Sequence, residues 1–197
     1  MKKDPSKHEL ILEAALREFQ ENGFERASMD RITEGAGVSK RTVYNHFQCK
    51  ITLFQTVISV MAERLKDSDP LQFDPKKPIL EQLIDLGRMK GKMLRSDQFM
   101  QLIRVAMSET LRDPDLAKAL SQKSNEAGDY AAFFEAAVKS KCLVADDPSQ
   151  IETQFIGLIK SQAFWPAIFS GEVLSEADMD KVIIESAKTI VAAYGAQ

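Results

Sequence analysis

The stretch Val38-Ser-Lys-Arg-Thr-Val-Tyr-Asn-His-Phe47 combines two cations, three hydroxyls, an amide and an imidazole with apolar residues. If Ser39 caps a helix, Val43 and Phe47 face the protein interior. Such a helix is about two turns long, and its other side chains cannot all be buried. These are Lys40, Arg41, Thr42, Tyr44, Asn45 and His46. The stretch therefore predicts a short helix that presents a polar face to another molecule.

A second short helix precedes this one in the sequence. Ser28 begins it, Ile32 is its buried residue, and Gly37 ends it because glycine tolerates the left-handed conformation. Two short helices joined by a three-residue turn have the form of a helix-turn-helix. In that motif the second helix enters the major groove of DNA and the first helix braces it.

Longer amphipathic helices flank this pair. Residues 7–22 carry apolar side chains at helical spacing, with Ser6 as their cap and Asn22-Gly23 as their end. Residues 50–66 carry a second apolar stripe that stops before Pro70. We expect the first three helices to form a small head and the 50–66 helix to connect the head to a body.

The exposed residues of the helix that Ser39 caps each have a use at a DNA surface. Arginine offers a bidentate fork to guanine, asparagine can pair with adenine, and the methyl group of threonine can meet that of thymine. Four side chains suit phosphates, namely Thr42, Tyr44, His46 and Lys50. From composition alone, a small helical subdomain with a solvated polar face is an equally good interpretation.

A longer ordered pattern favours the first interpretation. It consists of Phe19, Gly23-Phe24, Ser28-Met29, Ile32, Ala36-Gly37-Val38-Ser39, Thr42-Val43-Tyr44, His46-Phe47, Lys50 and Leu53-Phe54. This pattern, over about residues 8–55, resembles the N-terminal domain of TetR-type transcriptional regulators. The resemblance implies an all-α homodimer whose first three helices bind a double-stranded DNA operator. It also implies a variable C-terminal body that binds a small inducer, and binding of the inducer releases the operator.

The resemblance also implies which residues contact DNA. They are Ser28, Met29, Lys40, Arg41, Thr42, Tyr44, His46 and Lys50. Asn45, which we include in the candidate set, occupies a position where the residue type varies within the family. Arg41 departs from the family pattern, which often has glycine there, and the sequence leaves open whether Arg41 reads a base or binds a phosphate.

Composition limits the class of protein. The 197 residues are 44% hydrophobic and 28% charged, which is typical of an ordinary soluble protein with a core. The net charge of −3 argues against a protein that coats nucleic acid over its whole surface. Residues 1–50 hold nine Lys and Arg against eight Asp and Glu, whereas the rest of the chain holds 17 against 21. A nearly neutral head is therefore joined to an acidic body.

Neither a membrane span nor a cofactor site is predicted. The longest apolar run, residues 163–169, is far shorter than the roughly 20 residues that a membrane span needs, so we expect a cytoplasmic protein. Cys49 and Cys142 are too far apart in sequence to form a metal-ligand pair, and we expect no metal and no cofactor. Cys49 is open to two interpretations, a redox switch or a structural thiol.

The body reads as helical throughout, after a linker that contains Pro70, Pro75 and Pro78. Helical patterns cover about residues 79–95, 97–111, 115–140, 149–169 and 176–194, with a kink expected at Trp165-Pro166. The fold class is therefore all-α, with about nine helices. Residues 1–50 are the expected helix-turn-helix DNA-binding domain, and residues 51–197 the expected ligand-binding and dimerisation domain.

Soft apolar side chains gather in the body and predict a ligand cavity. They are Met89, Met93, Phe99, Met100, Ile103, Met107, Phe133, Phe134, Phe155 and Trp165. Methionine adapts its shape and packs against aromatic rings, which would suit a lipophilic ligand. Plain core is the alternative for each of them. Residues 104–116 also resemble the C-terminal domain of a TetR subgroup that is represented by a quorum-sensing and efflux-linked repressor.

Two apolar stripes near the C-terminus predict the dimer interface. They comprise Ile151, Phe155, Leu158, Ile159 and Gln162 on one helix and Val182, Ile183, Ala187 and Ile190 on the next. The alternative is ordinary core, and we expect each helix to serve partly as both.

A ligand-responsive repressor of a palindromic operator is the function that the sequence favours. The alternatives are a ligand-dependent activator, or a protein-interaction module that has kept this fold. An enzyme is disfavoured because the sequence contains no Gly-rich phosphate loop, no nucleophile elbow and no cluster of catalytic carboxylates or histidines.

Overall fold

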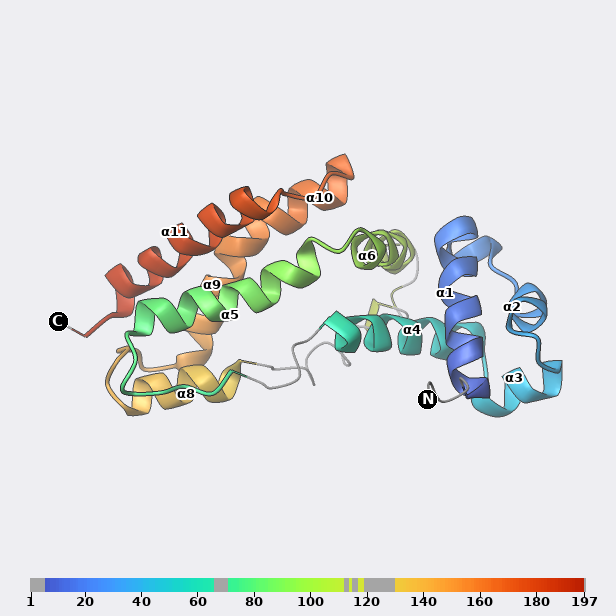
Figure 1. Cartoon of the computed structure of the whole chain (residues 1–197), viewed down its shortest axis with the longest axis horizontal. Coiled ribbons are helices and arrows are strands. Elements are labelled where there is room, and N and C mark those ends of the chain that lie inside the picture. The colour runs from blue at the N-terminus through green and yellow to red at the C-terminus, as the bar shows by residue number, and fades with distance from the viewer. Residues whose placement is uncertain (1–5, 66–70, 112–113, 115–116, 119–129, 197) are drawn as a thin grey trace, which may run out of the picture. The chain divides into compact units, whose positions relative to one another are not determined.

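The computed structural model describes residues 6–65, 71–111, 114, 117, 118 and 130–196. Within them the regular structure is helical, apart from one isolated bridge between Leu143 and Gly195 (Figure 1). The prediction of an all-α fold is confirmed. The chain divides into two compact units, one of residues 1–64 with 101–124 and the other of residues 65–100 with 125–197.

Unit 1 begins with the helices that the sequence predicts. They are α1 (Lys7–Arg26), α2 (Met29–Ala36), α3 (Lys40–His46) and α4 (Lys50–Leu65). Ser6 and Glu9 form a capping box at the start of α1. Gly23 interrupts the helix where the sequence predicts its end, with a φ of 71°, and a further helical turn follows as far as Arg26.

The core of unit 1 is built around three phenylalanine rings. Phe54 of α4 lies edge-on to Phe19, with ring centroids 4.8 Å apart, and 5.0 Å from the ring centroid of Phe24. Ile32 of α2 and Val43 of α3 are fully buried. Because α3 is so short, Val43 and the buried Phe47 just after it are what attach α3 to this core.

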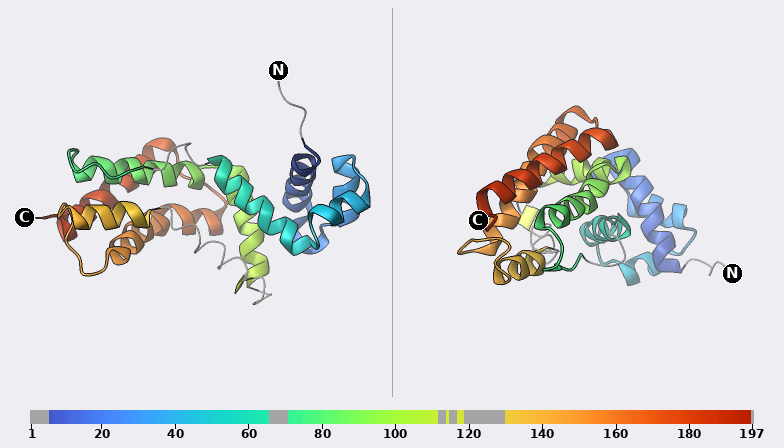
Figure 2. Two further views of the ribbon diagram at one scale, coloured as in Figure 1. Left: turned by 90° about the horizontal axis from the view of Figure 1, so that it is seen from below. Right: turned by 60° about the vertical axis from the view of Figure 1, so that its left-hand side comes forward.

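Unit 2 consists of helices that pack side by side. They are α5 (Ile79–Leu94), α8 (Ala131–Lys139), α9 (Pro148–Ile159), the π-helix η1 (Lys160–Phe164), α10 (Trp165–Ser170) and α11 (Glu176–Tyr194). Helix α6 (Asp97–Thr110) begins in unit 2 and continues in unit 1. Helix α11 packs along α5 and α9, and α8 packs against α9 (Figures 1 and 2).

One predicted helix of the body contains an irregular turn, and another lies partly outside the described residues. The predicted 149–169 helix contains the π-helical turn η1, in which the N–H of Trp165 donates to the carbonyl of Lys160. Pro166 has no N–H and crowds the preceding turn, and the wider π-helical turn just before it is a helix distortion at the place where the sequence predicts a kink. Of the predicted 115–140 helix, α8 is the part that the structure describes as a named helix, and residues 119–129 lie outside the described residues.

No helix in the described part of the chain combines the length and apolarity that crossing a bilayer requires. Over the same residues, no group of three or more His, Cys, Asp or Glu side chains is arranged to hold a metal ion.

Candidate nucleic-acid interface

Helix α3 is capped as the sequence predicts. Ser39 has an extended backbone, and its hydroxyl accepts a hydrogen bond of 3.1 Å from the backbone N–H of Thr42. The hydroxyls of Ser39 and Thr42 lie 2.8 Å apart. Ahead of the cap, Gly37 takes a φ of 64°, so the turn between α2 and α3 uses the left-handed conformation expected of glycine.

The polar residues of α3 lie on its outer face. Lys40, Arg41, Tyr44, Asn45 and His46 are exposed, and Thr42 is half-buried. Tyr44 is a large aromatic side chain with 42% of its surface exposed. The structure therefore brings all six predicted α3 residues together on one short helix that its apolar side chains anchor from behind.

Lys40 joins the starts of the two short helices. Its ammonium lies 2.7 Å from a carboxylate oxygen of Asp30 in the first turn of α2. The hydrogen bond and the charge of Asp30 raise the pKa of Lys40. Both side chains are well exposed, so this ion pair orients Lys40 and contributes little to stability.

The start of α2 holds the other predicted contacts, Ser28 and Met29, both half-buried. The hydroxyl of Ser28 accepts a hydrogen bond of 3.2 Å from the backbone N–H of Asp30. The carbonyl of Met29 accepts one of 2.7 Å from the hydroxyl of Thr33. The N-terminus of a helix, with its free backbone N–H groups and positive dipole end, favours phosphate groups.

Lys50 has a structural role that the sequence did not indicate. Its ammonium donates to the carbonyl oxygens of Glu25 at 3.0 Å and Ala27 at 3.2 Å, and lies 4.6 Å from the ring centroid of Phe24. An ammonium has three N–H donors. Lys50 therefore holds the end of α1, and at most one donor is left for the predicted phosphate contact.

The two histidines of the chain meet at the end of α3. The ring centroids of His8 and His46 are 5.6 Å apart, and His8 stacks on Phe47 at 5.1 Å. Because His8 lies at the start of α1, this contact orients the His46 ring from outside α3.

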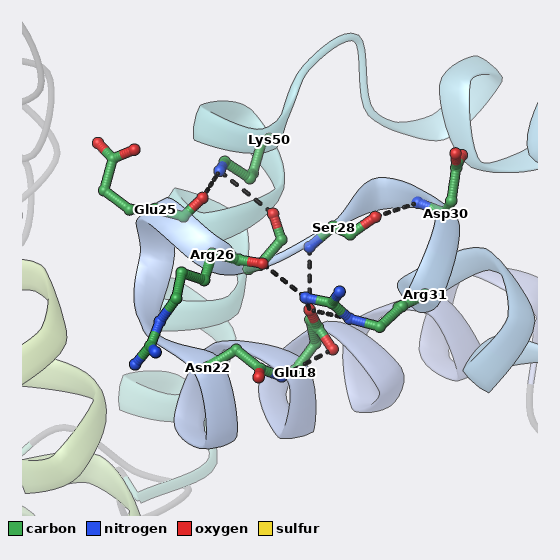
Figure 3. A network of polar contacts seen from close by, with 9 residues as sticks. Glu18, Asn22, Glu25, Arg26, Ser28, Asp30, Arg31 and Lys50 are labelled. Atoms are coloured by element: carbon green, nitrogen blue, oxygen red, sulfur yellow. Dashed lines mark hydrogen bonds and ion pairs between the residues drawn. The ribbon is translucent and has the colours of Figure 1, made fainter.

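A buried carboxylate ties α1 to α2 (Figure 3). Glu18 is only 8% exposed, and one of its oxygens accepts hydrogen bonds from Nε and Nη2 of Arg31 at 2.9 and 2.6 Å. The same oxygen accepts the backbone N–H of Ser28 at 2.9 Å, and the other oxygen accepts the side-chain amide of Asn22 at 3.1 Å. The hydrogen bonds from Arg31, Ser28 and Asn22 lower the pKa of Glu18.

Sequence reasoning missed this network, although one signal was available. Glu18 lies three and four residues after the buried Ala15 and Ala14, on the apolar face of α1 beside Phe19. A carboxylate on an apolar face indicates a buried partner, because an unpaired buried charge is costly. The partner, Arg31, lies thirteen residues away in the sequence. Only the packing of α1 on α2 shows which residue it is.

The lowered pKa of Glu18 gives a testable pH dependence. A carboxyl group with a depressed folded-state pKa stabilises the fold above its unfolded value, near 4.5, and the contribution is lost as the pH falls through the folded-state value. We therefore expect Glu18→Gln to melt below the wild-type protein at neutral pH, and the gap between the two melting temperatures to narrow on acidification. Melting curves followed by circular dichroism measure the gap. A gap that stays constant below pH 4.5 would contradict this role.

Cys49 lies directly before α4 and is exposed. Hydrogen bonds from the Thr52 side chain, then from the backbone N–H groups of Thr52 and Ile51, lower the pKa of its thiol. The sequence leaves open a redox switch or a structural thiol, and the exposure of Cys49 disfavours the structural thiol.

In unit 2, several predicted ligand residues form an aromatic cluster. Phe133 lies edge-on to both Phe73 and Phe134, with ring centroids 5.6 and 5.4 Å away, and Phe134 lies 6.3 Å from Phe155. Met93, Phe99 and Met100 are also buried, and Met89 is half-buried. Ile103 and Met107 are half-buried and belong to unit 1.

Trp165 lies apart from this cluster, so its predicted place in a ligand cavity stays a prediction. It is 44% exposed, lies edge-on to Phe164 and stacks on Phe169, which is itself 83% exposed. The reason is helical phase, because Ala163 and Ala167 face the core and turn the aromatic residues outward.

The predicted dimer interface also needs correction. Six of its residues are buried inside unit 2: Ile151, Phe155, Ile159, Ile183, Ala187 and Ile190. They pack between α9, α11 and α5, and a side chain covered by its own chain cannot contact a second copy. Leu158 and Val182 are half-buried and Gln162 is exposed, so these three still reach the surface.

An open groove of about 390 Å³ runs along α5 and α11 and was not predicted. Its floor contains Gly91, Met179 and Ile183, and charged residues form its walls. Arg88 binds Asp180 across the groove with two hydrogen bonds of 3.1 and 3.0 Å. The groove is therefore bridged by ion pairs within the chain.

Family models match both parts of the sequence. The model of the bacterial regulatory proteins of the tetR family matches residues 11–57, which include α2 and α3. The model of the AefR-like transcriptional repressor C-terminal domain matches residues 81–196.

Individual proteins that are similar to this chain are also transcriptional regulators. A solved TetR family transcriptional regulator from Pseudomonas syringae pv. tomato is 34% identical, with a TM-score of 0.80 over 99% of this chain and 100% of that one. The flavonoid-responsive regulator FrrA is 28% identical, with a TM-score of 0.79 over 97% of this chain and 98% of that one. The transcriptional regulator UidR of Escherichia coli is 31% identical over 62% of this chain, and the match spans 61% of UidR, less than two thirds.

Proposed function

Because the chain belongs to the TetR family of bacterial transcriptional regulators, we propose that it is a repressor that binds a palindromic operator as a homodimer. Regulators of this class act by binding DNA and not by catalysis. The observation that carries the proposal is the outer face of α3, where exposed polar side chains stand on a helix anchored by Val43 and Phe47. The match to an AefR-like repressor domain supports repression over activation. Such a protein acts on chromosomal DNA, so we place it in the cytoplasm.

A dimer follows from the size of α3. A helix of two turns reaches only a few base pairs, and each good bidentate contact discriminates by roughly 1–3 kcal/mol. Two copies of α3, related by twofold symmetry, double the contacts and require inverted half-sites.

The surface of unit 2 presents apolar side chains that a second copy could cover. Trp165 and Phe169 are exposed, and Leu158 and Val182 are half-buried. Trp165 and Phe169 stack on each other at the surface, and clustered exposed aromatic side chains are typical of protein interfaces. We propose that these residues, with Gln162, contact the second copy in place of the buried stripes.

The effector is proposed to be a small lipophilic molecule. The buried phenylalanine cluster with Met93 and Met100 is the kind of surroundings that such molecules bind. FrrA is named for its response to flavonoids, which makes planar aromatic compounds the first class to test on this chain. If the effector releases the operator, linkage requires that the operator weakens effector affinity by the same factor.

The proposal is tested by selecting bound duplexes from a random-sequence DNA pool with the full chain. We expect an enriched inverted repeat whose half-sites are centred one helical turn apart, about 34–36 Å, or a multiple of it. The same pool carried through without protein is the control. Enrichment of a single unrepeated site would refute the symmetric dimer, and no enrichment would refute sequence-specific binding.

A further inference from the structure

The segment that joins α1 to α2 has its backbone polar groups held by side chains from three helices (Figure 3). Lys50 of α4 donates to the carbonyls of Glu25 and Ala27. Arg31 of α2 donates to the carbonyl of Arg26. Glu18 of α1 accepts the backbone N–H of Ser28. The start of α2 is therefore set by ionic side chains as well as by apolar packing.

Glu18 occupies the centre of this arrangement. Its side chain is 9% exposed, and both carboxylate oxygens accept hydrogen bonds. Arg31 neutralises the buried charge and places its guanidinium between Glu18 and the carbonyl of Arg26. The Arg31 side chain is thereby directed back to α1.

Ser28 is the point through which Glu18 acts on α2. While its N–H is bound by Glu18, the Ser28 hydroxyl accepts the N–H of Asp30 and caps the helix. Only an acceptor can bind the Ser28 N–H, and a carboxylate is a stronger acceptor than an amide oxygen. Losing the carboxylate would loosen the orientation of the first turn of α2.

We propose that Glu18 is a positioning residue for DNA binding, which fixes the Ser28 backbone so that the start of α2 meets the DNA backbone in register with α3. This inference rests on the proposed function. It assigns a role to a residue that does not itself contact DNA.

The sign of one substitution separates positioning from simple electrostatics. Removing a carboxylate close to DNA would by itself strengthen binding, because repulsion of the phosphates is reduced. If Glu18 positions Ser28, Glu18→Gln instead weakens binding, by about tenfold. The measurement is fluorescence anisotropy with a labelled duplex that carries the sequence enriched from the random pool.

Salt dependence distinguishes a positioning role from a loss of folded protein. Each phosphate contact that is lost makes the slope of log K against log salt shallower by about 0.9. Partial unfolding lowers the active concentration but leaves that slope unchanged. We expect a shallower slope for Glu18→Gln than for wild type. Because the slope does not depend on the fraction of active protein, it separates positioning from unfolding even if the variant is less stable.

Two variants serve as matched controls. Glu21→Gln makes the same change of charge at an exposed position of α1, and we expect binding as tight as wild type or slightly tighter. Arg31→Lys keeps the charge but loses the fork that binds both Glu18 and the Arg26 carbonyl, and we expect a smaller loss of affinity than for Glu18→Gln because the bond from Ser28 to Glu18 remains.

Three outcomes would overturn the inference. If wild type binds the duplex and Glu18→Gln matches it in affinity and slope, the inference falls and the proposed function stands. If Arg31→Lys weakens binding as much as Glu18→Gln, the ion pair matters and not the Ser28 bond. If wild type binds no duplex, the proposed function falls as well.

Discussion

Tyr44→Ala is expected to reduce operator affinity by about 100-fold or more, because a hydrogen bond to a charged phosphate is lost once in each half of a symmetric dimer. Tyr44 is 42% exposed on the outer face of α3, so its removal leaves the core of unit 1 intact. Gel retardation or anisotropy with the selected duplex measures the loss. A phosphate contact predicts equal weakening on operator and random DNA, whereas Asn45→Ala should change the selected sequence if Asn45 reads a base.

The matched control is Leu111→Ala. Leu111 is 86% exposed in the same unit but off α3, so its truncation should leave DNA binding unchanged. Tyr44→Phe isolates the hydroxyl. If Tyr44→Ala binds the operator as tightly as wild type and melts at the same temperature, α3 is not part of the DNA interface. Lys50→Ala is a poorer test, because Lys50 also binds the carbonyls at the end of α1.

Gly87→Ala is expected to lower the free energy of unfolding of unit 2 by about 2 kcal/mol or more. A Cβ at this position would lie 2.5 Å from Cγ2 of Ile183 and 3.3 Å from Cζ of Phe155. Both neighbours are fully buried, so α5 and α11 have to move apart. The clash outweighs the gain of about 1 kcal/mol that alanine brings to a helix interior.

Denaturant unfolding followed by tryptophan fluorescence measures this effect, because Trp165 is the only tryptophan of the chain and lies in unit 2. Gly35→Ala is the matched control. Its Cβ would meet only Ala14, at an ordinary contact distance of 3.6 Å, so we expect a small gain in the stability of unit 1. A Gly87→Ala protein as stable as wild type would show that α5 and α11 are not in close contact there.

Local features were predictable from the sequence because they depend on neighbours in the chain. The caps at Ser6 and Ser39 and the left-handed Gly37 use hydrogen bonds and dihedral angles within a few residues. Helical periodicity likewise indicated that Val43 and Phe47 are buried. Because Val43 and Phe47 take the buried positions, the other residues of α3 are predicted to face outward.

Features that join distant residues were missed. Periodicity shows that a helix has an apolar face but not what covers it, so it predicts a dimer interface for residues such as Ile183 that are buried within their own chain. The two hydrogen bonds from Lys50 to the end of α1 join residues that are 25 and 23 positions apart in the sequence. Nothing in a local pattern identifies such a partner.

The sequence by itself determined the all-α class, the helix-turn-helix and the polar face of α3, because these depend on capping, periodicity and an ordered motif. Only the tertiary structure decided that Glu18 holds Ser28, that Trp165 faces outward and that Gly87 lets α11 approach α5. These depend on which surfaces of separate helices meet, and that is set by the packing of the whole chain.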